Sequence, residues 1–218
     1  MATDALIEIC ELFYSIQGES SYAGYPCFFI RFAGCNLRCS FCDTRYAYEG
    51  EHKSYTISQI LAELEKYPGI MVEITGGEPL LQEGVYPLFE HLLAAGRTVL
   101  LETNGSLSLK NVPADVVKIM DMKCPGSSMH DKMDYSNFGF VDLKDEIKFV
   151  ISSREDYNWA KELVTTYGLS ARTTVTFSPV MTRLSPPELA GWLLNDRLQV
   201  RLRLQLHTIL WPGMTRGY

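Results

Sequence analysis

Three of the six cysteines of this 218-residue chain fall within eight positions, as Cys35, Cys39 and Cys42 of "GCNLRCSFCDT" (34–44). Cysteine thiolates are the usual ligands of iron–sulfur clusters. Three thiolates from one loop can reach three corners of a 4Fe-4S cube and leave the fourth iron without a protein ligand. An open position of this kind is where a catalytic metal binds and activates a small molecule.

Two plainer interpretations of the spacing stay open. Positions i, i+4 and i+7 share one face of a helix, so the three thiols could be packing residues on a buried stripe. Gly34, Asn36 and Ser40 are poor helix formers and argue against that helix. A structural zinc site needs four ligands, commonly from two CxxC-type knuckles, and the sequence holds no second knuckle.

The other cysteines, Cys10, Cys27 and Cys124, are scattered along the chain. Three thiolates are too few for a second cluster. We expect Cys10 and Cys27 to be packing residues in the core. Cys124 follows a predicted strand end directly, so a role near the site stays open for it.

The composition favours a cytoplasmic protein with a small-molecule ligand. The net charge of −6 argues against a large nucleic-acid surface, which is normally basic. No apolar run is long enough to span a membrane, and "MATDALIEICELF" carries acidic residues where a secretory signal has basic ones. In a reducing compartment, clustered cysteines are ligands or reactive thiols rather than disulfides. The length predicts one domain over residues 1–218.

The elements that position the cysteines are predicted from periodicity. The apolar runs expected to form strands are 7–16, 27–34, 70–77, 98–105, 116–123, 146–152, 172–180 and 200–207. Helical spacing is found in 56–67, 84–96, 153–168 and 185–196. Thr56, Ser153 and Ser185 are polar starts, and Gly96 and Gly168 are glycine stops. Strands that alternate with helices predict a parallel sheet of βα units.

The predicted strand ends are rich in Gly, Pro, Thr, Asn and charge: "GCNLRC", "TGGEP", "ETNGS", "DMKCP" and "FSPV". Parallel βα sheets bind their ligands at the carboxyl ends of the strands, so these segments are expected to meet around one site. The polar segment 126–145 is longer than a normal connection, and we expect a flap or insertion there.

At this point the residues carry a family resemblance. CxxxCxxC after an early strand resembles the cluster motif of the radical S-adenosylmethionine (SAM) superfamily, and "TGGEP" resembles its motif for the SAM amino group. The stretches "FYSIQGESSYAGYPCFFIRFAGCNLRCSFCDTRYAY", "LLETNGS", "DMKCP", "EIKFVI" and "LQLHTILWP" are similar to the 7-carboxy-7-deazaguanine synthase (QueE) family. This resemblance covers essentially the whole chain.

The resemblance implies an incomplete (β/α)6-type barrel, a partial TIM barrel with the radical SAM fold, preceded by an N-terminal strand (7–16) with substrate contacts. It implies a lyase that converts 6-carboxy-5,6,7,8-tetrahydropterin to 7-carboxy-7-deazaguanine in queuosine (preQ0) biosynthesis, with loss of ammonia. Its cofactors would be a 4Fe-4S cluster with one open iron, SAM and Mg²⁺. An electron donor of the flavodoxin or ferredoxin type and a homodimer are also implied.

Several residues suit the pterin substrate of that family. Arg31 interrupts an apolar run, and its guanidinium could form a forked pair with the substrate carboxylate; a structural ion pair is the alternative. The pterin edge needs amide-like partners, which the backbone of Ile16, Gln17 and Gly18 and the side chain of Glu19 are expected to supply. A plain hairpin turn is the alternative for this stretch.

The resemblance also assigns residues to SAM: Phe41, Cys42, Asp43, Gly77, Glu78, Glu102, Asp121, Met122, Lys123, Ser178 and Pro179. Glu78 would accept a hydrogen bond from the SAM ammonium group, and Glu102 would hold its ribose or amino group. Thr44 would offer its hydroxyl to Mg²⁺, a cation that prefers oxygen ligands. Thr75 would face the substrate. Without the resemblance, Asp43 or Thr44 would be an ordinary cap and Glu102 part of an ion pair.

The run "VRLRLQLH" (200–207) alternates between apolar and polar residues, which predicts a strand with Gln205 and His207 on its polar face. On an open antiparallel sheet that face would be wet. In a partial barrel it would line the lumen, which makes Gln205 and His207 candidates for the substrate side.

Two other functions are compatible with a cysteine loop. A radical SAM activating enzyme would generate a glycyl radical on a partner protein and would need a docking face. An iron–sulfur electron carrier or redox sensor would bind no SAM and would not need "TGGEP" or "ETNG". The "IQGE" stretch, Arg31 and "CDT" favour the small-molecule enzyme.

Overall fold

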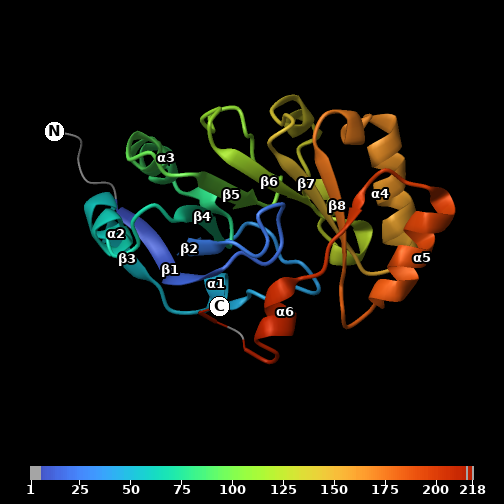
Figure 1. The fold of residues 1–218 in the computed structure, drawn as a ribbon, viewed down its shortest axis with the longest axis horizontal. Helices are drawn as coiled ribbons and strands as arrows, with labels where there is room; N and C mark the ends of the chain where they lie inside the picture. Colours follow the sequence, from blue (N-terminus) through green and yellow to red (C-terminus); the bar gives the residue numbers. More distant parts are fainter. Residues whose placement is uncertain (1–5, 215, 218) are drawn as a thin grey trace.

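A computed structural model describes residues 6–214 and 216–217. Its backbone is built on one sheet with strand order β3-β1-β2-β4-β5-β6-β7-β8-β9 (Figure 1). The strands are β1 (Leu6–Ile16), β2 (Pro26–Phe32), β3 (Lys53–Thr56), β4 (Met71–Gly76), β5 (Val99–Thr103), β6 (Val117–Met122), β7 (Glu146–Ile151), β8 (Thr174–Pro179) and β9 (Arg201–Leu202).

Neighbouring strands from β2 to β9 are parallel, whereas β1 pairs antiparallel with both β2 and β3. Six parallel strands, β2 and β4 to β8, form the centre of the sheet, which confirms the expected partial barrel with a preceding N-terminal strand. Figure 1 shows the sheet curving from β1 round to β8. All strands that the structure describes belong to this one sheet.

The helices are α1 (Tyr46–Glu49), α2 (Ile57–Leu64), α3 (Val85–Ala94), α4 (Arg154–Thr166), α5 (Pro186–Asp196) and α6 (Leu206–Leu210). The four helices predicted from periodicity are α2 to α5. Thr56 and Gln59 form a reciprocal capping box at the start of α2, and Ser153 accepts a hydrogen bond from the Asp156 amide at the start of α4. In the part of the chain that the structure describes, no helix is long and apolar enough to cross a membrane.

The central strands have two different faces because side chains alternate along a strand. On β4, Val72 and Ile74 point outward into the hydrophobic core. Glu73 and Thr75 point inward and line a cavity. Leu100, Val117 and Ile119 form a second buried apolar cluster, separate from the main core. The sheet thus buries apolar residues under the helices and keeps a polar interior at one end.

Two expectations about connections are corrected. The run 200–207 is not one strand: pairing with β8 is confined to Arg201–Leu202, and α6 begins at Leu206. The segment 126–145 is a long connection, but it is folded rather than a polar flap. It contains three short 3-10 helices, η2 (Pro125–Ser127), η3 (His130–Lys132) and η4 (Tyr135–Gly139).

One buried side chain explains why segment 126–145 is fixed. Asn137 is fully buried, donates hydrogen bonds to the carbonyls of Gly105 (3.2 Å) and Leu107 (2.9 Å), and accepts one from the Leu109 amide (2.8 Å). These bonds tie the segment to the loop that follows β5. Composition marked the segment as polar, but one of its polar side chains, Asn137, satisfies backbone groups inside the molecule.

Candidate active site

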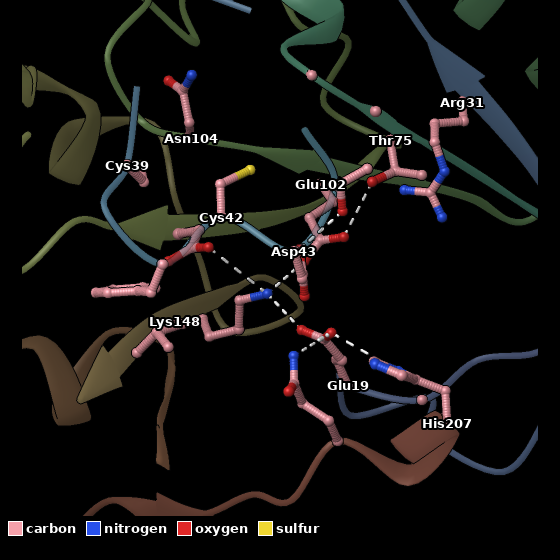
Figure 2. A pocket seen from close by; sticks show the side chains of 18 of the residues that line it. Glu19, Arg31, Cys39, Cys42, Asp43, Thr75, Glu102, Asn104, Lys148 and His207 are labelled. Carbon is pink, nitrogen blue, oxygen red and sulfur yellow. Dashed lines mark hydrogen bonds and ion pairs between the residues drawn. The ribbon is translucent and has the colours of Figure 1, made fainter. Parts of the chain in front are cut away.

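The carboxyl ends of the parallel strands surround a cavity of about 430 Å³ (Figure 2). Most of the residues predicted from the sequence line it: Ile16, Gln17, Gly18, Glu19, Arg31, Cys35, Cys39, Phe41, Cys42, Asp43, Thr44, Thr75, Gly77, Glu102, Asp121, Lys123, Pro179, Gln205 and His207. Three predicted residues, Glu78, Met122 and Ser178, are not part of its lining.

The cysteine loop (34–44) borders this cavity with all three of its thiols, and none of them is in a disulfide. Backbone hydrogen bonds fix the loop: the Gly34 amide donates to the Ala47 carbonyl (2.8 Å), and the Ser40 amide donates to the Ser127 carbonyl (3.0 Å). The loop is therefore held at both its start and its middle by neighbouring segments.

The thiols fit an iron–sulfur cluster better than the alternatives. The loop is not helical between Cys35 and Cys42, so the buried-stripe interpretation is wrong. Within residues 6–214 and 216–217, no three His, Cys, Asp or Glu side chains are arranged to hold a single metal ion. Thiols spaced around one cavity wall suit a cluster that takes one thiolate per iron. Burial raises the pKa of Cys39, which the nearby Lys123 partly opposes.

The "TGGEP" turn is locked against the cysteine loop. The Gly77 amide donates to the Phe32 carbonyl (3.1 Å), and the Glu78 amide donates to the Gly34 carbonyl (2.8 Å). Gly76 has a φ of +137°, and a Cβ there would lie 2.3 Å from the Phe32 carbonyl oxygen. The glycines were expected to let the backbone approach a ligand. They also let two loops of the protein pack on each other.

Glu78, which was expected to contact SAM, is not part of the cavity lining. Its side chain is fully buried outside the cavity and accepts hydrogen bonds from the Asn104 amide (2.7 Å), the Thr103 hydroxyl (2.8 Å) and the Leu80 amide (3.1 Å). Burial raises the pKa of this carboxyl, and those three donors oppose the rise. Glu78 therefore joins the end of β5 to the "TGGEP" turn.

Arg31 lies in the cavity wall, and one of its guanidinium nitrogens is already paired with a carboxylate of the protein. Its Nε donates to Glu11 Oε1 (2.6 Å), and the same oxygen accepts from the Tyr46 hydroxyl (2.9 Å). The terminal nitrogens Nη1 and Nη2 make no hydrogen bond with any residue that the structure describes. The side chain is thus both a structural ion pair, the alternative considered from sequence, and a guanidinium with a free fork.

The turn between β1 and β2 has its own anchors. Gln17 Oε1 accepts from the amides of Glu19 (2.9 Å) and Ser20 (3.0 Å), and Gln17 Nε2 donates to Glu73 Oε2 (2.9 Å). The Gln17 backbone amide and carbonyl are used in the hairpin itself. Glu73 was not predicted from the sequence, because one glutamate inside a strand does not reveal which way it points.

Gln205 and His207 reach the cavity from α6 rather than from a strand. The Leu206 amide donates to the Gly18 carbonyl (2.9 Å), which ties α6 to the β1–β2 turn. Gly18 permits this packing, since a Cβ there would lie 3.0 Å from His207 Nδ1. Gln205 Nε2 donates to Glu19 Oε1 (2.9 Å). Both residues were expected to reach the site from the polar face of a strand, whereas the structure places them at the start of α6.

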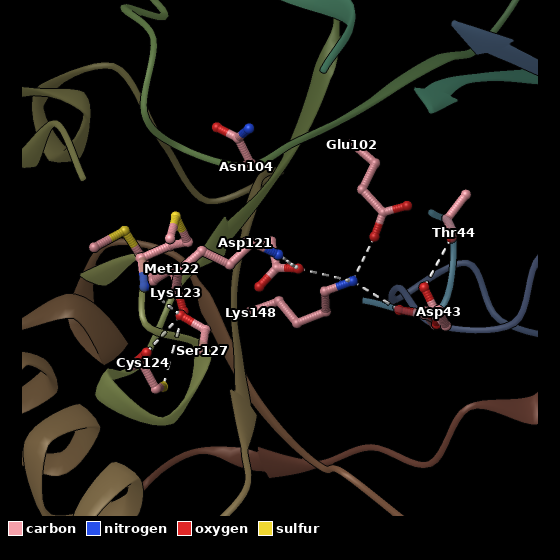
Figure 3. Close-up of polar contacts among 12 residues, drawn as sticks. Asp43, Thr44, Glu102, Asn104, Asp121, Met122, Lys123, Cys124, Ser127 and Lys148 are labelled. Carbon is pink, nitrogen blue, oxygen red and sulfur yellow. Dashed lines mark hydrogen bonds and ion pairs between the residues drawn. The ribbon is translucent and has the colours of Figure 1, made fainter. Parts of the chain in front are cut away.

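Lys148 is the main site residue that sequence analysis missed. Its Nζ lies 2.7 Å from Glu19 Oε2 (Figure 2), contacts Glu102 Oε1, and lies 3.7 Å from Asp121 Oδ2 (Figure 3). Burial alone would raise the pKa of Glu19, but Lys148 and His207 lower it below its usual value. In the sequence, Lys148 stands between apolar residues of the predicted strand "EIKFVI", and a charged residue at such a position indicates a polar interior site.

On the side of β6, Asp121 and Lys123 form an ion pair of 2.6 Å at the cavity. Asp121 Oδ1 is buried and has no hydrogen-bond partner among the described residues, which leaves it available to a ligand. Met122 points to the core, and the Ser178 hydroxyl donates to the Arg203 carbonyl (2.9 Å). Side-chain contacts of Met122 and Ser178 with SAM are therefore not supported.

Two residues with side-chain oxygens, Asp43 and Thr44, follow the last cysteine of the loop. The Thr44 hydroxyl donates to Asp43 Oδ1 (2.8 Å), and both residues line the cavity. Cys124, whose role was open, is buried in the hydrophobic core with its pKa raised well above the usual value by burial. Cys27 is fully buried too, as expected of a packing residue.

Comparison with known proteins shows what this geometry belongs to. Residues 29–189 match the family described as the Radical SAM superfamily. The chain is 45% identical to 7-carboxy-7-deazaguanine synthase of Koribacter versatilis, over 97% of this chain and 100% of the relative. It is 42% identical to the enzyme of that name from Chlorobaculum tepidum, over 100% of both chains. The chain belongs to the 7-carboxy-7-deazaguanine synthase family. The family expected from the sequence is confirmed.

Solved structures show the same fold. QueE from Escherichia coli is similar with a TM-score of 0.76 and 22% identity, over 93% of this chain and 95% of that chain. SuiB from Streptococcus suis is similar with a TM-score of 0.55 and 13% identity, over 83% of this chain and 50% of that chain. Membership of this radical SAM family implies a 4Fe-4S cluster and SAM as cofactors.

Proposed function

We propose that the protein converts 6-carboxy-5,6,7,8-tetrahydropterin to 7-carboxy-7-deazaguanine with loss of ammonia, on the path to queuosine. The observation that carries this proposal is the meeting of three free thiols and the open fork of Arg31 in one cavity. A radical cofactor and a carboxylate-bearing substrate both need to be held there. The relatives at 42–45% identity carry the name of this enzyme.

The three thiols would hold the 4Fe-4S cluster, with SAM at its open iron. When bound, this pair would supply the 5′-deoxyadenosyl radical that abstracts the substrate hydrogen at C6. The pterin ring would then contract. Phe41, Cys42 and Asp43 would lie along the SAM adenine. Gly77 would contact SAM from the "TGGEP" turn. Glu102, with Asp121, Lys123 and Pro179, would contact the rest of SAM from the ends of β5, β6 and β8.

On the substrate side, the free nitrogens of Arg31 would take the carboxylate in a forked pair. Glu19, kept ionised by Lys148 and His207, would accept hydrogen bonds from the N–H edge of the pterin. The backbone of Ile16 and Gly18, with Thr75, Gln205 and His207, would complete this half of the cavity. Closing the mouth of the cavity around the bound ligands would keep water and oxygen away from a radical intermediate and so prevent side reactions.

Thr44 would bind Mg²⁺ through its hydroxyl, with the substrate carboxylate as a second oxygen ligand. The support is the pair of oxygen groups that Thr44 and Asp43 present to the cavity. Thr44→Val removes the hydroxyl with little change of shape. We expect this variant to need more Mg²⁺ for half-maximal turnover, and an unchanged Mg²⁺ dependence would contradict the assignment.

Three further proposals concern the protein's surroundings. Cytoplasmic location is supported by the six cysteines, all free in the structure, which suits a reducing compartment. A homodimer is proposed by family analogy and is tested by light scattering of the purified protein. The electron donor is proposed to be a flavodoxin or ferredoxin. Replacing dithionite by reduced flavodoxin in the turnover assay tests this.

The deciding experiment is anaerobic turnover with a reconstituted cluster, SAM, Mg²⁺, dithionite and the carboxytetrahydropterin. We expect 7-carboxy-7-deazaguanine by mass, lost in Cys39→Ala and retained in Cys10→Ala, whose half-buried thiol lies outside the cavity. Release of 5′-deoxyadenosine without that product would contradict the substrate assignment and favour an activating enzyme. No SAM cleavage from a loaded cluster would favour an electron carrier.

A further inference from the structure

Lys148 projects from β7 into the middle of the cavity, where its side chain is only 4% exposed. One ammonium group meets carboxylates from three segments: Glu19 in the β1–β2 turn, Glu102 on β5 and Asp121 on β6 (Figures 2 and 3). Burial alone would lower the pKa of Lys148, but the three carboxylates raise it well above its usual value. The group is therefore a permanent cation at neutral pH.

The carboxylates that Lys148 joins are assigned to different ligands by the proposed function, Glu19 to the pterin and Glu102 to SAM. Glu19 uses its other oxygen, Oε1, to accept from Gln205 Nε2 on the proposed substrate side (2.9 Å). Glu102 uses Oε2 to accept from the Thr75 hydroxyl (3.0 Å). Each carboxylate thus has one oxygen on Lys148 and one on a local partner. Lys148 joins the two carboxylates directly, and Thr75, which is proposed to face the substrate, adds a second link to Glu102.

We propose that Lys148 is a positioning residue that couples the binding of SAM to the binding of the pterin. The proposal rests on the proposed function, which gives Glu19 to the pterin and Glu102 to SAM. Either ligand, by engaging its carboxylate, fixes the ammonium and with it the carboxylate on the other side. The second ligand then meets a network that is already ordered, so it binds more tightly.

Charge reinforces this coupling. Glu19, Glu102 and Asp121 would repel one another in the cavity, and Lys148 is a cation that contacts all three. Without it, the carboxylates would take up protons or turn apart, and both ligand sites would lose their geometry. Because coupling free energies are reciprocal, the pterin must strengthen SAM binding by the same factor as SAM strengthens pterin binding.

The test is anaerobic calorimetry on reconstituted protein with Mg²⁺ and no reductant, so that no turnover occurs. The carboxytetrahydropterin is titrated with and without saturating SAM, and SAM is titrated with and without the pterin. In the wild type, each ligand is expected to tighten the other about fivefold or more. In Lys148→Met, both affinities are expected to fall on the order of tenfold and the coupling factor to approach one.

Lys118 provides a matched control. It is equally buried and pairs with Asp145 Oδ2 at 2.9 Å, but it lies outside the cavity lining. Lys118→Met is expected to lower the melting temperature and to leave the coupling factor unchanged. If Lys148→Met does not fold, Lys148→Gln, which keeps a hydrogen-bond donor without the charge, takes its place in the same titrations.

Each of the remaining outcomes would contradict either the coupling role of Lys148 or the proposed substrate. A folded Lys148 variant that keeps the wild-type coupling, or that weakens only one ligand, would overturn the coupling role. A wild type that binds both ligands independently would overturn it as well. A wild type that binds SAM but not the pterin would instead overturn the proposed substrate, and the coupling with it.

Discussion

Gly77 lies against Gly34 so closely that a Cβ on Gly77 would come within 1.9 Å of the Gly34 carbonyl oxygen. The same Cβ would lie 2.9 Å from the Cβ of Cys35. The turn after β4 and the start of the cysteine loop are therefore fitted together through backbone alone. Gly77, which was expected to contact SAM, therefore also fixes the position of Cys35, the first proposed cluster ligand.

Gly77→Ala is expected to displace the cysteine loop, because neither backbone can give way to the added methyl group. We expect a loss of about 1–3 kcal/mol in the free energy of unfolding and less iron bound per chain after reconstitution. Urea unfolding and iron analysis measure the two effects. Gly139→Ala is the control, since nothing lies within 4 Å of a Cβ there. Full iron content in Gly77→Ala would contradict this account.

Arg31→Lys is expected to raise KM for the carboxytetrahydropterin on the order of tenfold with a smaller change in kcat. Lysine can keep the ion pair with Glu11 but cannot present a second pair of donors to the carboxylate. Steady-state kinetics separate the two constants. Arg172→Lys, at an exposed arginine, serves as the control.

A ligand without the carboxylate sharpens the test of Arg31. Tetrahydropterin that lacks the 6-carboxylate should bind equally well to the wild type and to Arg31→Lys. If Arg31→Lys weakens both ligands to the same extent, the guanidinium acts on the shape of the site and not on the carboxylate.

Glu73 is expected to make stability depend on pH. Burial first, and then the Glu102 carboxylate, raise its pKa from 4.5 to about 8. Glu19 also faces it and raises the pKa, whereas Gln17 and Lys148 lower it. The folded protein holds this proton more tightly than the unfolded chain does. The destabilisation is therefore absent below about pH 4.5, grows as the pH rises, and is complete above about pH 8.

Glu73→Gln keeps an oxygen that can accept from Gln17 and removes the ionisation. Relative to the wild type, this variant is expected to gain stability steadily from about pH 5 to pH 8. Urea unfolding at a series of pH values measures the difference. Glu90→Gln, at an exposed glutamate on α3, should show a flat difference. A flat difference for Glu73→Gln as well would mean that the carboxyl is ionised throughout.

Asn137→Ala is expected to cost about 2–3 kcal/mol of unfolding free energy. The substitution leaves the Leu109 amide and the carbonyls of Gly105 and Leu107 without their partner inside the protein. Chemical denaturation measures the loss. Ser136→Ala changes an exposed neighbour and should be close to neutral. A similarly small effect for Asn137→Ala would show that segment 126–145 is held by its apolar residues.

The local features of this protein follow from the sequence. Thr56 with Gln59 and Ser153 with Asp156 announce the starts of α2 and α4, because capping depends on neighbours three residues apart. The three clustered cysteines and the glycine-rich strand ends lie in short segments whose spacing is itself the signal. The resemblance of these segments to one family predicted the family of the whole chain, and full-length relatives confirm it.

Only the tertiary structure decided which polar side chains face the cavity. Glu78 and Glu73 lie five residues apart in or beside β4, yet Glu78 is buried against β5 and Glu73 faces the interior. His207 reaches the site from α6, because the chain after β9 turns back to Gly18. Lys148 gains its role from carboxylates 27 to 129 positions away in the chain. Such contacts depend on how strands curve and pair, which residue spacing along one strand does not encode.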